Sequence, residues 1–183
     1  NRATTPLWGW VGLVTPADTL GGRLALLAGL ALFSLGMSGL ERLLGLNALL
    51  EELIATGPVV ELARIDPVPA ALIAGLAYAV LRTGGAEELL FRGLIYKRLI
   101  AWFGEGPANI TQSLLFTLIH NGLVQAALPD APLWLHADIF VRVFVYSWVL
   151  GWYMERRDNG SLLMPWICHS TLNFLTFLSF LLP

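Results

Sequence analysis

The feature that most constrains this chain is a series of long apolar segments. Residues 24–40, LALLAGLALFSLGMSGL, carry no charge and lie between Arg23 and Glu41. That length is about the minimum for a helix that crosses a bilayer, and the segment extends to Leu46. Strand patterning is absent. The other candidate spans are 68–103, 108–128, 137–155 and 161–182. We therefore expect an all-α, polytopic integral membrane bundle with about five spanning helices and an interfacial helix.

The composition agrees with a membrane protein. The chain is 56% hydrophobic and only 13% charged, whereas soluble domains are about 45–50% apolar and about 25% charged. A net charge of −2 and the lack of a basic block exclude nucleic acid as an expected partner. The single cysteine, Cys168, excludes an internal disulfide. No internal repeat or long linker divides the chain, so residues 1–183 are expected to form one domain in contact with membrane lipid.

Residues 47–66 differ from the spans because glutamates, Arg64 and Asp66 alternate with leucines. This mixture predicts a helical piece that lies at the membrane interface. A break is expected around Gly57-Pro58.

Residues 68–103 are too long for one straight span. The segment contains the pair Gly84-Gly85. Two interpretations remain open: one long tilted helix, or two pieces hinged at the glycines.

The basic residues predict an orientation. An alternating topology puts six of them on one side: Arg2, Arg23, Lys97, Arg98, Arg156 and Arg157. The other side keeps mainly Arg42 and Arg64 among several acids. Because basic loops stay in the cytoplasm, the N-terminus is expected there. Four further residues near span ends are expected at the interface, without a part in any site: Arg82, Arg142, His136 and Asp138.

The rare polar residues inside the spans agree in depth. At about 1.5 Å per helical residue, Glu87 lies about 15 Å from the basic end and His120 about 20 Å. His169 and Asn173 lie about 12–18 Å from it on the last span. A shared site explains this agreement better than scattered structural residues do, because ionisable groups inside a membrane are costly.

Each of these residues also has a structural interpretation. Glu88 and Arg92 are four positions apart and can neutralise each other. His120 or Asn173 alone can form a hydrogen bond that joins two helices. Glu87 points about 100° away from Glu88 on a helix, so it is free to act as a general base.

Two chemistries fit two histidines and two glutamates. One is a metal site with histidine and carboxylate ligands and an open position for water. In the other, a carboxylate activates water while a histidine and an asparagine stabilise the oxyanion. Both lead to hydrolysis, with an amide as the expected substrate, and the spacing alone does not choose between them.

Three short motifs, in order and on separate spans, carry a family resemblance. EELLFRG at 87–93 resembles an EExxxR motif, FTLIH at 116–120 an FxxxH motif, and HSTLN at 169–173 an HxxxN motif. Together they resemble the CPBP family of CAAX proteases and bacteriocin-processing enzymes, and are similar to its type II CAAX prenyl endopeptidases. The resemblance covers residues 70–180.

The resemblance implies an intramembrane endopeptidase that cleaves a peptide bond near the cytoplasmic leaflet. It implies that Glu87 is the general base, with His120 beside it, and that His169 and Asn173 form the oxyanion hole. The implied substrate is a peptide or a membrane protein.

The same resemblance implies that Glu88, Arg92 and Phe116 support the site. No cofactor is implied, because the eukaryotic members look glutamate-dependent. The cation of Arg92 near Glu87 also disfavours a divalent ion. A divalent metal such as zinc is the alternative.

Two departures from the family pattern bear on function. Val124 stands where the eukaryotic enzymes tend to have a further polar residue, and the chain is shorter than most members. Both favour a compact bacterial type, and hence the bacterial inner membrane. Since some members are discussed as immunity or accessory proteins, the alternative to an enzyme is a non-catalytic scaffold or the subunit of a membrane-protein complex.

Overall fold

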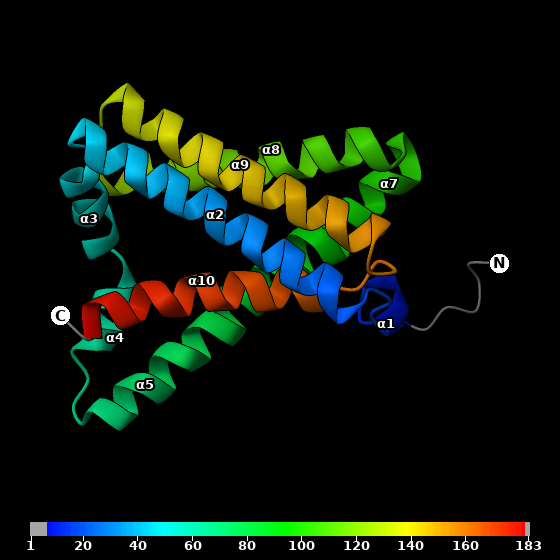
Figure 1. Ribbon diagram of the computed structural model, residues 1–183, viewed down its shortest axis with the longest axis horizontal. Coiled ribbons are helices and arrows are strands. Elements are labelled where there is room, and N and C mark those ends of the chain that lie inside the picture. The colour runs from blue at the N-terminus through cyan, green and yellow to red at the C-terminus, as the bar shows by residue number, and fades with distance from the viewer. Residues whose placement is uncertain (1–6, 182–183) are drawn as a thin grey trace.

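The computed structural model describes residues 7–181, which form helices and no strand (Figure 1). The all-α prediction is therefore confirmed for this part of the chain. The helices are α1 (Leu7–Trp10), α2 (Leu20–Leu44), α3 (Asn47–Ala55), α4 (Pro58–Ala63), α5 (Val68–Ala77), η1 (Tyr78–Gly85), α6 (Ala86–Glu88), η2 (Leu89–Tyr96), α7 (Lys97–Phe103), α8 (Glu105–Ala127), α9 (Leu133–Arg156) and α10 (Leu163–Leu181).

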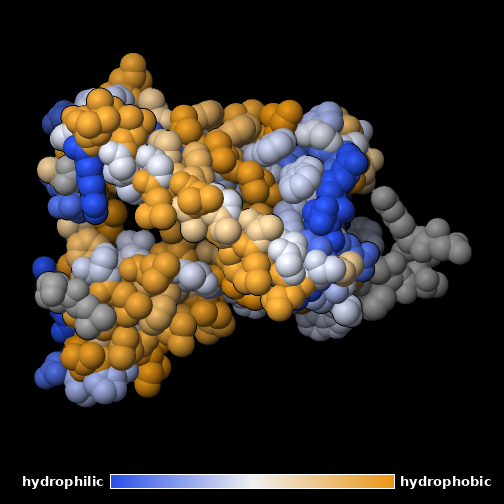
Figure 2. Space-filling view, in the orientation of Figure 1, coloured by the Kyte–Doolittle hydropathy of each residue, from blue (hydrophilic) through white to orange (hydrophobic). Residues whose placement is uncertain are grey.

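Five long rods run between two ends of the molecule: α2, the continuous segment from α5 to α7, α8, α9 and α10 (Figure 1). Three of them, Leu20–Leu44, Val68–Phe103 and Leu133–Arg156, are long and apolar enough to cross a membrane. For α8 and α10, which carry more amide, hydroxyl and imidazole groups, crossing stays a prediction. Figure 2 shows apolar side chains over the middle of the visible face and hydrophilic ones toward both ends.

The segment expected at the interface is helical and broken at the predicted place. α3 ends at Ala55, Gly57 is extended (φ −82°, ψ 161°) and α4 begins at Pro58. Proline is favoured at the first helical position because its missing N–H would have no partner there. Both short helices lie at the end of the molecule opposite α1 (Figure 1).

Residues 68–103 form one continuous 36-residue helix rather than two hinged pieces. Two π-helical stretches, η1 and η2, lie on either side of the Glu87-Glu88 pair. π-Helical turns are rare and frequently occur at functional sites.

The glycines of this helix permit close packing rather than a bend. A Cβ at Gly84 would collide with the Ser170 hydroxyl of α10 and lie 2.8 Å from the Ala79 carbonyl oxygen. A Cβ at Gly85 would lie 3.0 Å from the Trp166 ring. The two glycines therefore let α10 approach η1 closely enough to bring its polar residues beside Glu87.

One end of the bundle collects the basic residues, as the sequence predicts; Arg2 lies outside the described residues. Five contacts tie this end together: Lys97 with Glu155, Arg156 with Glu105, Arg23 with Asp158 (3.7 Å), Arg157 with Asp18 (3.7 Å), and Arg98 over the Trp10 ring (3.8 Å). The shared end agrees with an alternating topology.

Arg142 corrects an expectation. It does not extend to an interface, because its side chain is 18% exposed and pairs with Glu41 of α2 and Asp138 of α9. Glu41 is buried, and a buried carboxylate requires a cation nearby. Together with the Ser34–Tyr146 hydrogen bond (3.1 Å), this pairing ties α2 to α9.

Candidate active site

Glu87 and two histidines converge from three helices, which was the geometry predicted from their depth. Oε2 of Glu87 lies 3.9 Å from Nε2 of His120 on α8 and 3.8 Å from Nε2 of His169 on α10. Oε2 is buried and makes no hydrogen bond within the described residues. The separations exceed a direct hydrogen bond, and the Glu87 side chain as a whole is 27% exposed.

The hydrogen bonds at the far side of each ring decide what Nε2 presents to Glu87. Nδ1 of His120 lies 2.8 Å from the Phe116 carbonyl oxygen, and Nδ1 of His169 lies 2.8 Å from Oε1 of Glu88. A carbonyl and an ionised carboxylate only accept, so each Nδ1 carries the hydrogen. In a neutral ring, Nε2 then presents its lone pair toward Glu87.

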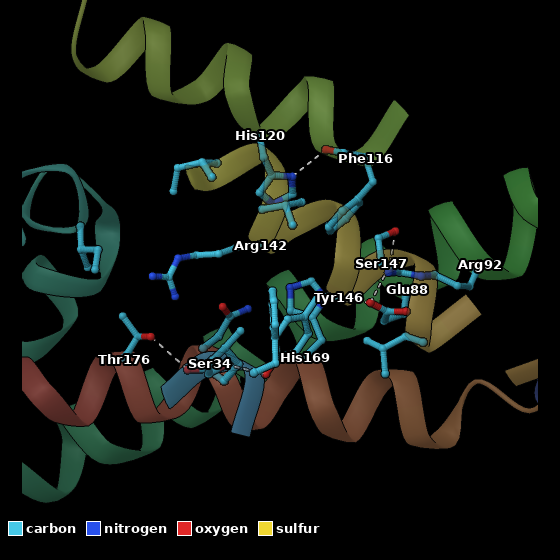
Figure 3. Close-up of a pocket in the computed structure, with 17 residues that line it drawn as sticks. Ser34, Glu88, Arg92, Phe116, His120, Arg142, Tyr146, Ser147, His169 and Thr176 are labelled. Atoms are coloured by element: carbon cyan, nitrogen blue, oxygen red, sulfur yellow. Dashed lines mark hydrogen bonds and ion pairs between the residues drawn. The ribbon is translucent and has the colours of Figure 1, made fainter. Parts of the chain in front are cut away.

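Glu88 and Arg92 form the predicted pair, with Nη1 donating to Oε1 at 2.7 Å and both side chains 1% exposed. The guanidinium lies 4.8 Å from the centroid of the Phe116 ring. That ring is also tilted against His120, with centroids 4.3 Å apart. Phe116 thus supports both the cation and a histidine. Figure 3 shows Glu88 and Arg92 together at one end of the site.

Asn173 lines the same cavity as His120 and His169, but its amide is held elsewhere. Its Nδ2 donates to the Thr83 hydroxyl at 2.7 Å, and that hydroxyl donates to the Ala79 carbonyl oxygen at 3.1 Å. The sequence analysis did not single out Thr83. A threonine inside an apolar helix commonly bonds to its own backbone, so nothing in the sequence marks this one.

A cavity of about 390 Å³ is lined by His120, His169 and Asn173 but not by Glu87, and it extends toward the end that carries α3. Glu88, Arg92, His120 and His169 line it toward the basic end (Figure 3), and Ile54 of α3 also lines it. Most of the rest of the lining is apolar. A cavity of this size and character suits a short peptide segment with apolar side chains.

The residues here also bear on metal binding. Within residues 7–181, no group of three or more His, Cys, Asp or Glu side chains is arranged to hold a metal ion. The 3.8 and 3.9 Å separations exceed the roughly 3.3 Å expected between two ligands of a tetrahedral zinc ion. The Nδ1–H bonds to oxygen acceptors nevertheless resemble those of metal-binding histidines.

Comparison with known proteins gives one family. Residues 69–175 match the family model described as type II CAAX prenyl endopeptidase Rce1-like. This segment contains all seven residues predicted for the site, from Glu87 to Asn173. Searches of curated proteins and of solved structures found no match.

Proposed function

Because the chain belongs to the type II CAAX prenyl endopeptidase Rce1-like family, we propose that it is an intramembrane endopeptidase whose Glu87 activates the attacking water. One observation carries this proposal: Oε2 of Glu87 lies 3.9 Å from Nε2 of His120 and 3.8 Å from Nε2 of His169. The family is a protease family. Three helices of this chain are long and apolar enough to cross a membrane, in agreement with a membrane protein. The reaction and the residue roles are our proposal.

The first step uses Glu87 and His120. A water between them donates one hydrogen to the carboxylate and one to the Nε2 lone pair, which directs an oxygen lone pair at the peptide carbonyl carbon. As the C–O bond forms, the water proton passes to Glu87. The tetrahedral intermediate then breaks its C–N bond, and Glu87 returns that proton to the leaving amine.

His169 and Asn173 are proposed to stabilise the oxyanion. Since Nδ1–H of His169 already donates to Glu88, Nε2 can donate only when the ring is an imidazolium. Asn173 uses one amide hydrogen on Thr83 and has a second one for the substrate.

The experiment compares purified protein with the Glu87→Gln variant, both reconstituted in lipid vesicles. Farnesylated and unmodified CAAX peptides serve as probes, and the membrane peptides that accumulate in cells carrying the variant identify other substrates. We expect cleavage products from the wild type and none from Glu87→Gln. Identical product profiles would support the non-catalytic scaffold instead.

A metal-dependent hydrolase is the second candidate, because both Nε2 lone pairs are available once each Nδ1 carries hydrogen. Elemental analysis of the purified protein distinguishes the two candidates. The metal-free proposal expects less than stoichiometric zinc and activity that persists in a chelator. Stoichiometric zinc that is lost in His120→Ala would overturn it.

The orientation is also a proposal: the basic end, with Asn159 in the α9–α10 turn, faces the cytoplasm of a bacterial inner membrane. The cavity extends away from that end, so it alone does not support cleavage near the cytoplasmic leaflet. Cys168 is buried, so a cysteine placed at Asn159 or at Asp130 can be labelled selectively. We expect a membrane-impermeant maleimide to reach only Asp130→Cys in spheroplasts.

A further inference from the structure

A chain of buried polar side chains leads from the site into the interface between α8 and α9. Arg92 donates from Nη1 to Glu88 and from Nη2 to the Ser147 hydroxyl at 3.0 Å. Its guanidinium face lies over Phe116. Both terminal nitrogens of Arg92 and one face of its guanidinium are therefore held. Among these partners, only Ser147 comes from α9.

Ser147 is itself held by Gln112 of α8. Its hydroxyl donates to Oε1 of Gln112 at 3.3 Å, which leaves an oxygen lone pair for Arg92. Gln112 in turn donates to Asn109 at 2.9 Å and to Ser113 at 2.8 Å. Ser147 and Gln112 are 0% exposed, so no bulk water can replace either partner.

The direction of the hydrogen bonds is fixed along the whole chain. Ser147 can accept from Arg92 because Gln112 takes its hydrogen, and Arg92 can hold Glu88 because its other arm is anchored. Glu88 then receives Nδ1–H of His169 on the oxygen that Arg92 also contacts. Loss of the Ser147 hydroxyl would therefore disturb the position of the His169 ring, which faces Glu87.

We propose that Ser147 and Gln112 are positioning residues: through Arg92 and Glu88 they keep the hydrogen of His169 on Nδ1 and its Nε2 aimed at Glu87. Neither lies in the three sequence motifs. Their effect on turnover rests on the proposed protease function, whereas their effect on His169 does not.

The variant that tests this is Ser147→Ala, which leaves Nη2 of Arg92 without its acceptor. Relative to wild type acting on the same probe peptide, we expect kcat of Ser147→Ala to fall by about 10- to 100-fold and KM to change by less than about twofold. Ser147→Thr keeps the hydroxyl and adds one methyl group beside the cavity that Ser147 lines. It should restore most of the activity.

A spectroscopic readout makes the test independent of protease activity. The chain has three histidines, so ¹⁵N spectra of histidine-labelled protein in detergent can be assigned by replacing His120 and His136 in turn. In the wild type, we expect His169 to carry hydrogen on Nδ1. In Ser147→Ala, the His169 signals should shift or broaden through exchange between the two nitrogens.

The matched control is Ser170→Ala, which removes a buried hydroxyl of α10 that has no hydrogen-bond partner within the described residues. It should leave the hydrogen of His169 on Nδ1 and cause no broadening from exchange between the two nitrogens. If Ser147→Ala does not fold, Ser147→Cys keeps the shape with a weaker acceptor and should give an intermediate shift. Unchanged His169 signals in a folded Ser147 variant would overturn the proposal, even if kcat fell. Shifted His169 signals in Ser147→Ala, with no cleavage by the wild type, would contradict the protease function but support the positioning of His169 by Ser147.

Discussion

Glu88 accepts a hydrogen bond from Nδ1 of His169 at 2.8 Å, although the two residues are 81 positions apart in the chain. The sequence pairs Glu88 with Arg92, one helical turn away, and that pair is present. The same carboxylate oxygen serves both partners. Glu88 thus connects the buried cation to the histidine that faces Glu87, so the two adjacent glutamates have separate tasks.

Glu88→Gln should destabilise the protein, because it leaves the buried Arg92 without a counter-charge. We expect the free energy of unfolding in detergent to fall by about 3 kcal/mol. Glu87→Gln is the matched control: Glu87 is 27% exposed on its side chain and should change stability by less than about 1 kcal/mol. Equal stability of the two variants would contradict the structural task of Glu88.

Gly84→Ala should separate α10 from η1. The new Cβ would collide with the Ser170 hydroxyl and lie 3.2 Å from the Ser170 backbone nitrogen of α10, and a backbone atom cannot rotate away. We expect a loss of about 1–3 kcal/mol in denaturant unfolding, together with loss of cleavage because His169 moves with α10. Gly36→Ala in α2, where nothing lies within 4 Å, should be neutral or slightly stabilising. A Gly84→Ala variant with wild-type stability and cleavage would contradict the close packing of α10 against η1.

Arg142→Met should loosen α2. It would leave two carboxylates, Glu41 and Asp138, buried or nearly so without their cation. We expect a loss of about 3 kcal/mol in unfolding free energy and faster proteolysis of the loop between α2 and α3. The control is Arg42→Met, since Arg42 follows Glu41 in α2 but is exposed. Equal effects of the two changes would show that α2 does not depend on this ion pair.

The basic end should show a pH dependence through Asp18. The Tyr153 hydroxyl, together with the Thr19 backbone N–H and the Arg157 guanidinium, lowers the pKa of Asp18. A carboxyl with a lowered folded-state pKa adds stability above its unfolded pKa of about 3.9. That stability is lost as the pH falls through the folded-state value.

Thermal melts should therefore separate wild type from Asp18→Asn at pH 7, and the difference should shrink as the pH falls below about 4. Asp130→Asn, at an exposed position, should match the wild type at pH 7. A constant difference between Asp18→Asn and wild type from pH 7 to pH 3 would show that the carboxylate charge is not what matters.

The fold class was readable because a bilayer imposes simple rules. Apolar length predicted α2 and α9, and the Gly57-Pro58 break appeared where the interfacial segment predicted it. The long helix was left open between two interpretations. Sequence spacing could not choose, because glycine permits a bend and a close contact equally; the packing of α10 against Gly84 decided it.

Part of the candidate site could be predicted from the sequence and part could not. Helical rise placed Glu87, His120 and His169 at one depth, and these three do converge. Arg142 was misjudged, because a cation near a span end looks the same whether it reaches water or a buried acid on another helix. Thr83, Gln112 and Ser147 gave no signal, because single hydroxyl and amide residues are common in helices.

The sequence by itself determined that this chain is a helical membrane protein, which rare residues lie at one depth, and that the basic residues share one end. These properties depend only on hydropathy and on distance along a helix. Only the tertiary structure decided the partners across helices: Glu88 with His169, Arg92 with Ser147, and Asn173 with Thr83. Such contacts depend on how each helix is rotated about its axis, and that rotation is set by packing between segments far apart in the chain.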